Sequence, residues 1–125
     1  MTTRFEPNFV LLYVRSPLES VAFYTALLGK PPVESSPTFA LFALDSGVML
    51  GLWQSSGVQP AATAPGGSEL AFAVDGADAV EARHEAWKAQ GIPVIQPPTA
   101  MDFGHTFTAL DPDGHRLRVF APRME

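Results

Sequence analysis

The sequence repeats itself, and this repeat constrains the fold more than any other feature. The stretch GKP at 29–31 recurs as GIP at 91–93, and ALDSG at 43–47 recurs as ALDPDG at 109–114 with one residue inserted. An apolar strand pattern followed by a helical pattern precedes these stretches in both halves. Features that match in the same order predict two copies of one strand–helix–strand–strand–strand unit, related by a pseudo-twofold axis.

The first half begins with a buried-strand pattern, FVLLYV, at 9–14. A helix is predicted after it, because Ser16 suits the N-cap, Pro17 suits the first helical position and Glu19 completes a capping box. The stretch FALFALDSGVMLGLW at 39–53 then predicts two strands joined by a short turn.

The second half follows the same plan. ELAFAV at 69–74 predicts a strand, and DGADAVEARHEAWKAQG at 75–91 predicts a helix that ends at its last glycine. PVIQPP at 93–98 is short and extended, and HTFTALDPDGHRLRVF at 105–120 predicts another hairpin. The stretch PPTAMDFGH at 97–105 is rich in Pro and Gly and predicts a loop, with Met and Phe side chains that could cover a site.

These patterns predict one α+β domain over residues 1–125, built from two βαβββ modules at about 5–54 and 68–123. Each module is expected to curl a small mixed sheet with its helix on the convex side. Residues 55–67 are expected to form a mobile linker, because this part of the chain contains Gly, Pro, Ser and Ala and no charge.

Composition narrows the class of protein. The net charge is -5 and no cluster of Lys and Arg is present, which argues against binding to nucleic acid or anionic membranes. No apolar run reaches the roughly 20 residues of a membrane span, and the first residues lack the layout of a signal peptide. The absence of cysteine excludes disulfides, thiolate metal sites and a cysteine nucleophile. We therefore expect a cytoplasmic protein.

Three stretches carry a resemblance to a known family: VRSPLESVAFYTALLG at 14–29, ELAFAV at 69–74 and DPDGHRLRVF at 111–120. Together with the repeat, they resemble the vicinal oxygen chelate superfamily, which holds glyoxalase I, extradiol dioxygenases and the bleomycin-resistance proteins. The resemblance implies that the two modules form one cup-shaped mixed sheet. It also implies where a metalloenzyme of this family would hold a divalent metal: at the start of the first strand and the middle of the last strand of each module. Many activities share the fold, so the resemblance says less about activity.

In this sequence the four metal-ligand places fall at Phe9 (or Asn8), Gly51, Glu69 and Arg118. Only Glu69 could bind a divalent cation well, and Arg118 brings a fixed positive charge to the place. We therefore expect no metal, no other cofactor and no catalytic residue. Arg118 is expected to pair with Glu69 inside the cup, and the alternative is a surface arginine without a function.

The histidines do not complete a metal site. His84 lies among charged residues and is expected on a solvated helix face, and His115 is expected to be exposed in a turn. His105 begins a strand and is the only histidine expected to reach the cup. One His and one Glu do not make the usual three-ligand catalytic site. Asp111 and Asp113, in DPDG, are expected to form a turn.

Strand alternation predicts which side chains line the cup. Phe107 is expected opposite Arg118 if a four-residue turn sets the register, with His105 and Phe120 on the same face. Trp53 is the expected stacking platform for a flat ligand. The expected ligand-binding residues are Phe9, Leu11, Tyr13, Met49, Trp53, Glu69, His105, Phe107, Arg118 and Phe120. A mainly apolar lining with a few polar groups is typical of small-molecule sites, although the same aromatic residues could fill a core or a dimer interface.

The resulting hypothesis is a metal-free, cytoplasmic protein that holds a small aromatic or drug-like compound. The resemblance to the bleomycin-resistance branch implies antibiotic resistance by sequestration. The alternatives are a divalent-metal-dependent lyase, isomerase or dioxygenase of the glyoxalase type, a metal-free enzyme with Glu69 or His105 as its base, and a domain that only binds another protein. Exposed strand edges predict a homodimer, with modules placed side by side or swapped.

Overall fold

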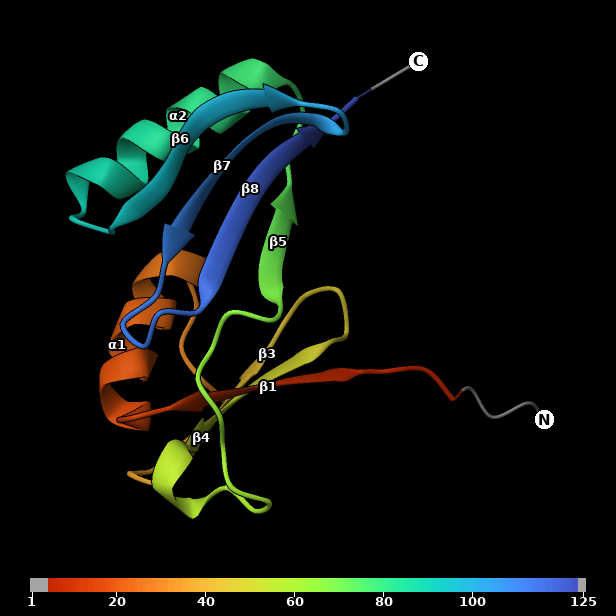
Figure 1. The fold of residues 1–125 in the computed structure, drawn as a ribbon. Helices are drawn as coiled ribbons and strands as arrows, with labels where there is room; N and C mark the ends of the chain where they lie inside the picture. Colours follow the sequence, from red (N-terminus) through yellow and green to blue (C-terminus); the bar gives the residue numbers. More distant parts are fainter. Residues whose placement is uncertain (1–4, 124–125) are drawn as a thin grey trace. The chain divides into compact units, whose positions relative to one another are not determined.

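The same series of one helix and four strands occurs twice along the chain (Figure 1). The computed structural model describes residues 5–123. It divides into two units between Ala64 and Pro65, and each unit contains one helix and one four-stranded sheet. The α+β class and the two βαβββ modules that the repeat predicts are therefore confirmed.

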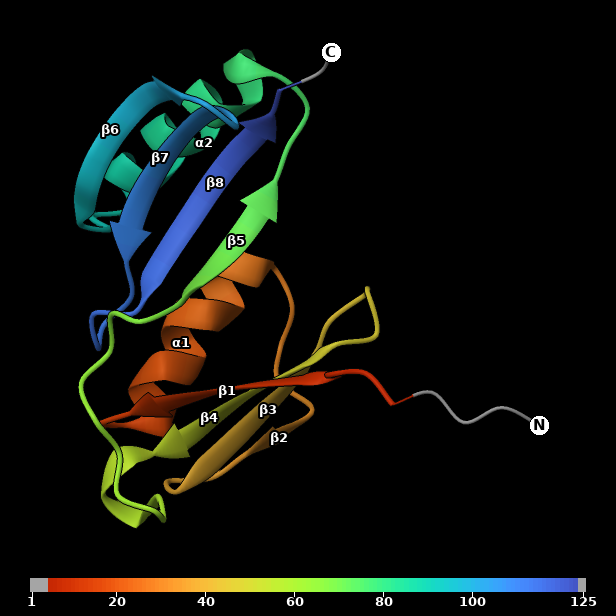
Figure 2. The ribbon, with the colours of Figure 1, turned by 45° about the vertical axis from the view of Figure 1, so that its right-hand side comes forward.

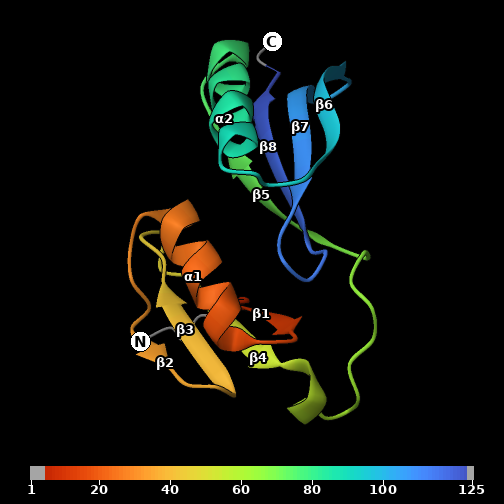
Figure 3. The ribbon, with the colours of Figure 1, turned by 90° about the vertical axis from the view of Figure 1, so that its left-hand side faces the viewer.

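The first unit contains sheet A and helix α1. Strand β1 (Phe9–Val14) pairs in parallel with β4 (Met49–Gln54), and the antiparallel strands β3 (Phe39–Ala43) and β2 (Glu34–Ser35) complete the order β1-β4-β3-β2. Helix α1 (Pro17–Leu28) covers one face of this sheet, as Figure 3 shows.

Helix α1 begins and ends where the sequence predicts. The backbone N–H of Glu19 donates to the Oγ of Ser16 at 3.3 Å, so Ser16 is the N-cap. At the other end, Gly29 has the left-handed conformation, and its N–H donates to the carbonyl of Thr25 at 2.9 Å. These contacts satisfy backbone groups that the ends of a helix leave without partners.

The second unit contains sheet B and helix α2. Strand β5 (Glu69–Ala73) pairs in parallel with β8 (Arg116–Pro122), and β7 (Gly104–Leu110) and β6 (Val94–Met101) complete the order β5-β8-β7-β6. Helix α2 (Ala77–Ala89) lies behind this sheet in Figure 2. The strand order is that of sheet A, so the sequence repeat corresponds to a repeat in topology.

Each helix packs against its own sheet through aromatic rings. In the first unit, Tyr24 of α1 lies edge-on to Phe42, with ring centroids 6.5 Å apart. In the second, Trp87 of α2 lies edge-on to Phe72 at 5.9 Å and to Phe107 at 5.4 Å. We call the sheet face under the helix the helix-covered face and the opposite face the helix-free face. The buried apolar side chains of the strands belong to the helix-covered faces.

Residues 97–105 belong mostly to strands, so the predicted covering loop is wrong. Strand β6 continues through Pro97 and Pro98, with register shifts on both sides of Gln96. N–H groups of adjacent strand residues point in opposite directions, so one of the two prolines faces the open edge of β6, where no ladder hydrogen bond is lost. The other faces β7, and the register shift between Gln96 and Thr99 lies at this place. The two prolines therefore bend an edge strand and do not end it.

The segment between the two sheets starts with a single turn of 3-10 helix, Ser55–Gly57, and Val58 after it is buried. The expected mobility of 55–67 stays a prediction. The boundary between the units lies inside this segment.

Candidate functional site

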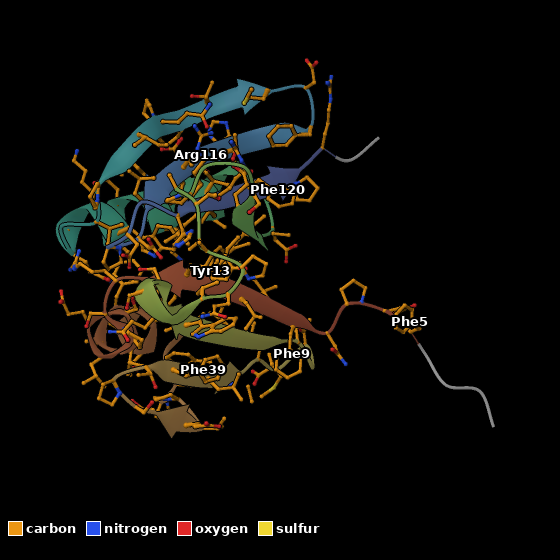
Figure 4. All side chains as sticks on the ribbon, turned by 60° about the horizontal axis from the view of Figure 1, so that its bottom comes forward. Phe5, Phe9, Tyr13, Phe39, Arg116 and Phe120 are labelled. Atoms are coloured by element: carbon orange, nitrogen blue, oxygen red, sulfur yellow. The ribbon has the colours of Figure 1, made fainter. Side chains whose placement is uncertain are left out.

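The helix-free face of sheet A is apolar. Phe9, Leu11 and Tyr13 of β1 are exposed on it, and they pair with Met49, Gly51 and Trp53 of β4. Tyr13 lies edge-on to Trp53, with ring centroids 6.1 Å apart. Figure 4 shows Phe9, Tyr13 and Phe39 on this sheet. The shared face that alternation predicts for the five side chains of β1 and β4 is therefore present.

Apolar side chains close over Gly51. A Cβ atom at this position would lie 2.6 Å from Cδ2 of Leu11 and 3.1 Å from Cζ of Phe39. A side chain on Gly51 would therefore have to displace both neighbours. This family ligand place has neither a metal-binding group nor room for one.

The helix-free face of sheet B carries a charged pair instead. Arg118, in the middle of β8, donates from Nε to Oε1 of Glu69 at 2.5 Å and from Nη2 to Oε2 at 3.3 Å. Arg118 pairs across the strands with Ala71, and Glu69 lies two residues earlier on β5. The guanidinium therefore reaches along the sheet past a small side chain, and it binds both carboxylate oxygens, which gives a strong and directional contact. The predicted interaction of Glu69 with Arg118 is confirmed.

Polar groups of β6 and β7 hold the other end of the guanidinium. Nη1 of Arg118 donates to Oε1 of Gln96 at 3.1 Å and to Oγ1 of Thr106 at 3.2 Å. Oε1 of Gln96 also accepts from Oγ1 of Thr108 at 3.0 Å. Both threonines are buried. These contacts hold the guanidinium in one orientation, and we name the five residues the Arg118 cluster: Glu69, Gln96, Thr106, Thr108 and Arg118.

A hollow of about 410 Å³ lies beside this cluster, lined by Glu69, Ala71, Phe103, Arg118 and Phe120. The Phe103 ring centroid lies 5.8 Å from Cζ of Arg118, and this ring stands edge-on to Phe120 at 6.0 Å. Phe120 is labelled in Figure 4 together with Arg116 of the same strand. Aromatic walls beside a few placed polar groups are typical of small-molecule sites.

Gly104 places Phe103 beside the hollow. A Cβ atom on Gly104 would overlap the carbonyl oxygen of Ala121, and its φ of 143° also favours glycine. The N–H of Arg123 donates to the carbonyl of Phe103 at 2.8 Å, which ties the β6–β7 turn to the end of β8. Phe103, predicted from the sequence to lie in a covering loop, is not among the expected ligand-binding residues. Met101 pairs with Gly104, so the hairpin has a two-residue loop, Asp102-Phe103, and the glycine next to Phe103 is the signal in the sequence for a close backbone approach.

Two expected ligand-binding residues lie on the helix-covered face of sheet B. Arg118 pairs with Thr108, so the prediction that Phe107 falls opposite Arg118 is wrong. Phe107 is buried against helix α2, and Nε2 of His105 lies 2.9 Å from Oε2 of Glu81 on the same helix. The prediction that His105 shares the face of Arg118 is also wrong.

The cause is the length of the β7–β8 turn. The N–H of Asp111 donates to the carbonyl of His115 at 3.0 Å, which leaves three residues, 112–114, in the loop and not four. A change of one residue in register moves every side chain of a strand to the other face. Oδ1 of Asp111 accepts from the N–H groups of Asp113 and His115 at 2.9 Å each, so the predicted turn role of Asp111 is confirmed.

His84 is also placed differently from its prediction. Its side chain is 13% exposed, and its ring lies edge-on to Phe107 with centroids 5.3 Å apart. Val80, His84 and Trp87 form one stripe of helix α2 that faces the sheet. Their spacing of four and three residues predicts that they share one face of the helix, although the residues beside His84 are charged. His115 is half-buried in the turn.

The residues at the four ligand places do not fit a divalent cation. Phe9 is apolar, Gly51 is covered and Arg118 is positively charged, while both oxygens of Glu69 accept hydrogen bonds from the guanidinium. Among residues 5–123, no group of three or more His, Asp or Glu side chains could hold a metal ion. The same part of the chain contains no helix that is long and apolar enough to span a bilayer.

Residues 7–119 match the family model described as Glyoxalase/Bleomycin resistance protein/Dioxygenase superfamily. The chain belongs to this superfamily. The resemblance inferred from the sequence is therefore confirmed. Within the superfamily, a phenazine antibiotic resistance protein, EhpR, from Enterobacter agglomerans is 34% identical over 116 residues, which cover 90% of this chain and 89% of that protein.

Solved structures agree on the superfamily fold. The solution structure of ATC0852 from Agrobacterium tumefaciens is 51% identical, with a TM-score of 0.89 over 97% of this chain and 100% of that one. A glyoxalase-related enzyme from Fulvimarina pelagi is 26% identical, with a TM-score of 0.79 over 93% of this chain and 87% of that one. In this chain Arg118 and Glu69 bind each other at two of the places where the resemblance implies metal ligands in the metalloenzymes of the family.

Proposed function

We propose that this protein binds a flat aromatic compound of the phenazine class and protects cells by holding it, without a metal and without changing it. The observation that carries the proposal is the hollow beside the Arg118 cluster, where Phe103 and Phe120 stand next to a guanidinium. The class of compound comes from the similarity to EhpR, whose name describes resistance to a phenazine antibiotic.

The aromatic residues of the hollow can stabilise such a ligand. Phe103 is 44% exposed, so a flat compound could cover much of its ring. An aromatic contact is worth about 0.5–1.5 kcal/mol beyond the area that it buries. Ala71 adds no bulk beside Arg118, which leaves space for the ligand's edge to approach the guanidinium.

The helix-free face of sheet A is the second surface in this proposal. Trp53 and Tyr13 meet edge-on there, and Phe9, Leu11 and Met49 extend the apolar surface. Exposed aromatic area of this extent is unusual for a surface without a function. We propose Trp53 as a stacking residue, and the two surfaces are tested separately.

Binding fits the site better than acid–base catalysis. Taking a proton from a ligand would neutralise Glu69 and leave the guanidinium of Arg118, which binds both of its oxygens, without a counter-charge, so Glu69 is a poor base. His105 contacts Glu81 on the helix-covered face, away from the hollow. The two candidate bases of the metal-free enzyme hypothesis are therefore engaged elsewhere.

A cytoplasmic homodimer is part of the proposal. Strand β1 is an edge strand of sheet A, and its side chains Phe9 and Leu11 are 52% and 44% exposed. A second copy could cover such an edge, because unpaired strand edges and apolar surface favour association. Sedimentation that gives only a monomer at micromolar concentrations would refute this part.

The test is calorimetric titration of the protein with phenazine, together with native mass spectrometry of the complex. We expect a ligand at the hollow and a second ligand on the helix-free face of sheet A, no stoichiometric metal and full recovery of unchanged compound. Phe103→Ala should weaken binding about tenfold, which is about 1.4 kcal/mol. Phe5→Ala, at a fully exposed ring in the other unit, is the matched control and should change nothing. Consumption of the compound, or one bound metal per chain, would favour the enzyme alternative.

A further inference from the structure

We propose that the hollow selects uncharged ligands whose polar edge carries an acceptor and a donor side by side, as a primary carboxamide does, and that it discriminates against carboxylates. This inference rests on the proposed function, because it concerns the ligand of the same site. It follows from the state of Arg118, which is charged but already paired.

The charges in the hollow cancel. Arg118 and Glu69 both line it, and the two hydrogen bonds between them hold the charges together. A ligand carboxylate that approaches the guanidinium would also approach the Glu69 carboxylate, and the two negative charges would repel each other. The anion would also lose water, because the side chain of Arg118 is only 17% exposed.

The Arg118 cluster has N–H groups that a ligand could use as hydrogen-bond donors. A guanidinium has five N–H groups, and Arg118 uses one at Nε, two at Nη1 and one at Nη2. The second N–H of Nη2 has no acceptor among residues 5–123. Within the described part of the chain, the amide nitrogen of Gln96 contacts only the sulfur of Met101, at 3.4 Å, and this sulfur is a weak acceptor. The cluster therefore has N–H donors to spare.

Glu69 supplies the complementary acceptor. Each carboxylate oxygen has two lone pairs, and Arg118 uses one donor on each oxygen. A primary carboxamide could accept from the remaining N–H of Arg118 and donate to Glu69 while the ion pair stays intact. A carboxylate has no hydrogen to donate to Glu69, so it can use only half of this arrangement.

The experiment compares two ligands of the same shape, phenazine-2-carboxamide and phenazine-2-carboxylate, by calorimetry at pH 8, with unsubstituted phenazine as a reference. The wild-type protein should bind the carboxamide at least about tenfold more tightly, which corresponds to about 1.4 kcal/mol. Glu69→Gln leaves the guanidinium without a counter-charge, so the preference should disappear or reverse. Glu85→Gln, an exposed change of the same charge on α2, should keep the wild-type preference.

Each outcome of this experiment supports or overturns one of the two proposals. Equal binding of the two ligands by the wild type, or tighter binding of the carboxylate, overturns this inference and leaves the proposed function in place. A preference that survives Glu69→Gln overturns its assignment to the ion pair. If none of the three compounds binds, both proposals fail. Should Glu69→Gln not fold, the double variant Glu69→Gln with Arg118→Met removes both charges and should also lose most of the preference.

Discussion

The two units of this protein place opposite chemistry at one equivalent position. In sheet A the cross-strand pair is Leu11 with Gly51, and in sheet B it is Ala71 with Arg118. Each pair joins one large and one small side chain, but the large one sits on the first strand in sheet A and on the last strand in sheet B. Sheet A therefore fills the position with hydrocarbon, whereas sheet B fills it with a guanidinium.

The neighbouring strands, β3 in sheet A and β7 in sheet B, differ in the same way: one is apolar at this place and the other is polar. Phe39 pairs with Trp53 in sheet A, and Thr106 pairs with Phe120 at the equivalent place in sheet B. Phe39 closes over Gly51, whereas the hydroxyl of Thr106 accepts from Arg118 at 3.2 Å. Apart from His105, the helix-covered faces of both sheets are apolar. The comparison shows that the repeat preserves the faces that build the fold and lets the helix-free faces diverge.

The largest expected effect comes from removing the charge that distinguishes sheet B. Arg118→Met leaves Glu69 without its cation and removes two hydrogen bonds from Gln96 and Thr106. We expect a loss of about 2–3 kcal/mol in the free energy of unfolding, measured by urea denaturation. The double variant with Glu69→Gln should recover about 1 kcal/mol of this loss.

Arg116→Met is the matched control for this cycle. Arg116 lies on the same strand and face but is exposed, so its removal should change the stability by less than about 0.5 kcal/mol. If the changes in the free energy of unfolding at Glu69 and Arg118 simply add, the ion pair does not stabilise sheet B.

A smaller effect is expected from the aromatic residue that distinguishes sheet A. Trp53→Ala should weaken binding of phenazine at least about tenfold, or about 1.4 kcal/mol, because a flat ligand would lose its stacking partner. Trp53→Phe keeps a ring and should restore most of the affinity. Calorimetry is the measurement, with thermal melting to verify the fold. Unchanged affinity in Trp53→Ala would confine binding to sheet B.

The packing over Gly51 gives the third prediction. Gly51→Ala pushes the new Cβ into Leu11 and Phe39, which offsets the gain of about 0.5–1 kcal/mol that Ala brings over Gly in a strand. In a Leu11→Ala background the nearest clash is gone, so Gly51→Ala should become stabilising by about 0.5 kcal/mol. Urea denaturation of the wild type, the two single variants and the double variant gives the coupling energy between positions 11 and 51. No coupling would mean that Leu11 moves away without cost.

The smallest effect concerns a contact that only the first unit has. Nζ of Lys30 donates to Oδ1 of Asp45 at 2.6 Å and to the carbonyl of Ala43 at 2.7 Å, and the second unit has a buried Ile92 at the matching place. The hydrogen bond and the charge of Lys30 hold the pKa of Asp45 below its ordinary value of 3.8.

A lowered pKa in the folded state stabilises the protein above the ordinary value, and this stabilisation is lost as the pH falls through the folded-state pKa. The difference in stability between the wild type and Asp45→Asn should therefore be present at pH 6 and vanish toward pH 2–3, in denaturation curves taken at each pH. Asp102→Asn, at an exposed turn of the second unit, is the control. A difference that is independent of pH would contradict the ion pair.

Local patterns in the sequence were enough to predict the ends of α1 and the strands of both hairpins. The pairing of Glu69 with Arg118, which lie 49 residues apart, was inferred from the ligand places that the family resemblance implies. Ser16 and Gly29 act on neighbouring backbone groups, so their effect depends on little beyond the adjacent residues. The faces of β1 and β4 followed from alternation alone, because Phe9, Leu11 and Tyr13 alternate with the buried Leu12 and Val14. The repeat then carried the same plan to the second unit.

Only the tertiary structure decided the rest of the site. The hydrogen bond between Asp111 and His115 set a loop of three residues, and this single residue moved Phe107 and His105 to the helix-covered face and brought Thr106 and Thr108 to Arg118. Phe103 joined the hollow because the chain at Gly104 approaches Ala121 too closely for any side chain. The sequence by itself determined which segments form strands and helices, since those preferences are local. Which side chains meet depends on register and close approach, which are settled between strands that lie far apart in the chain.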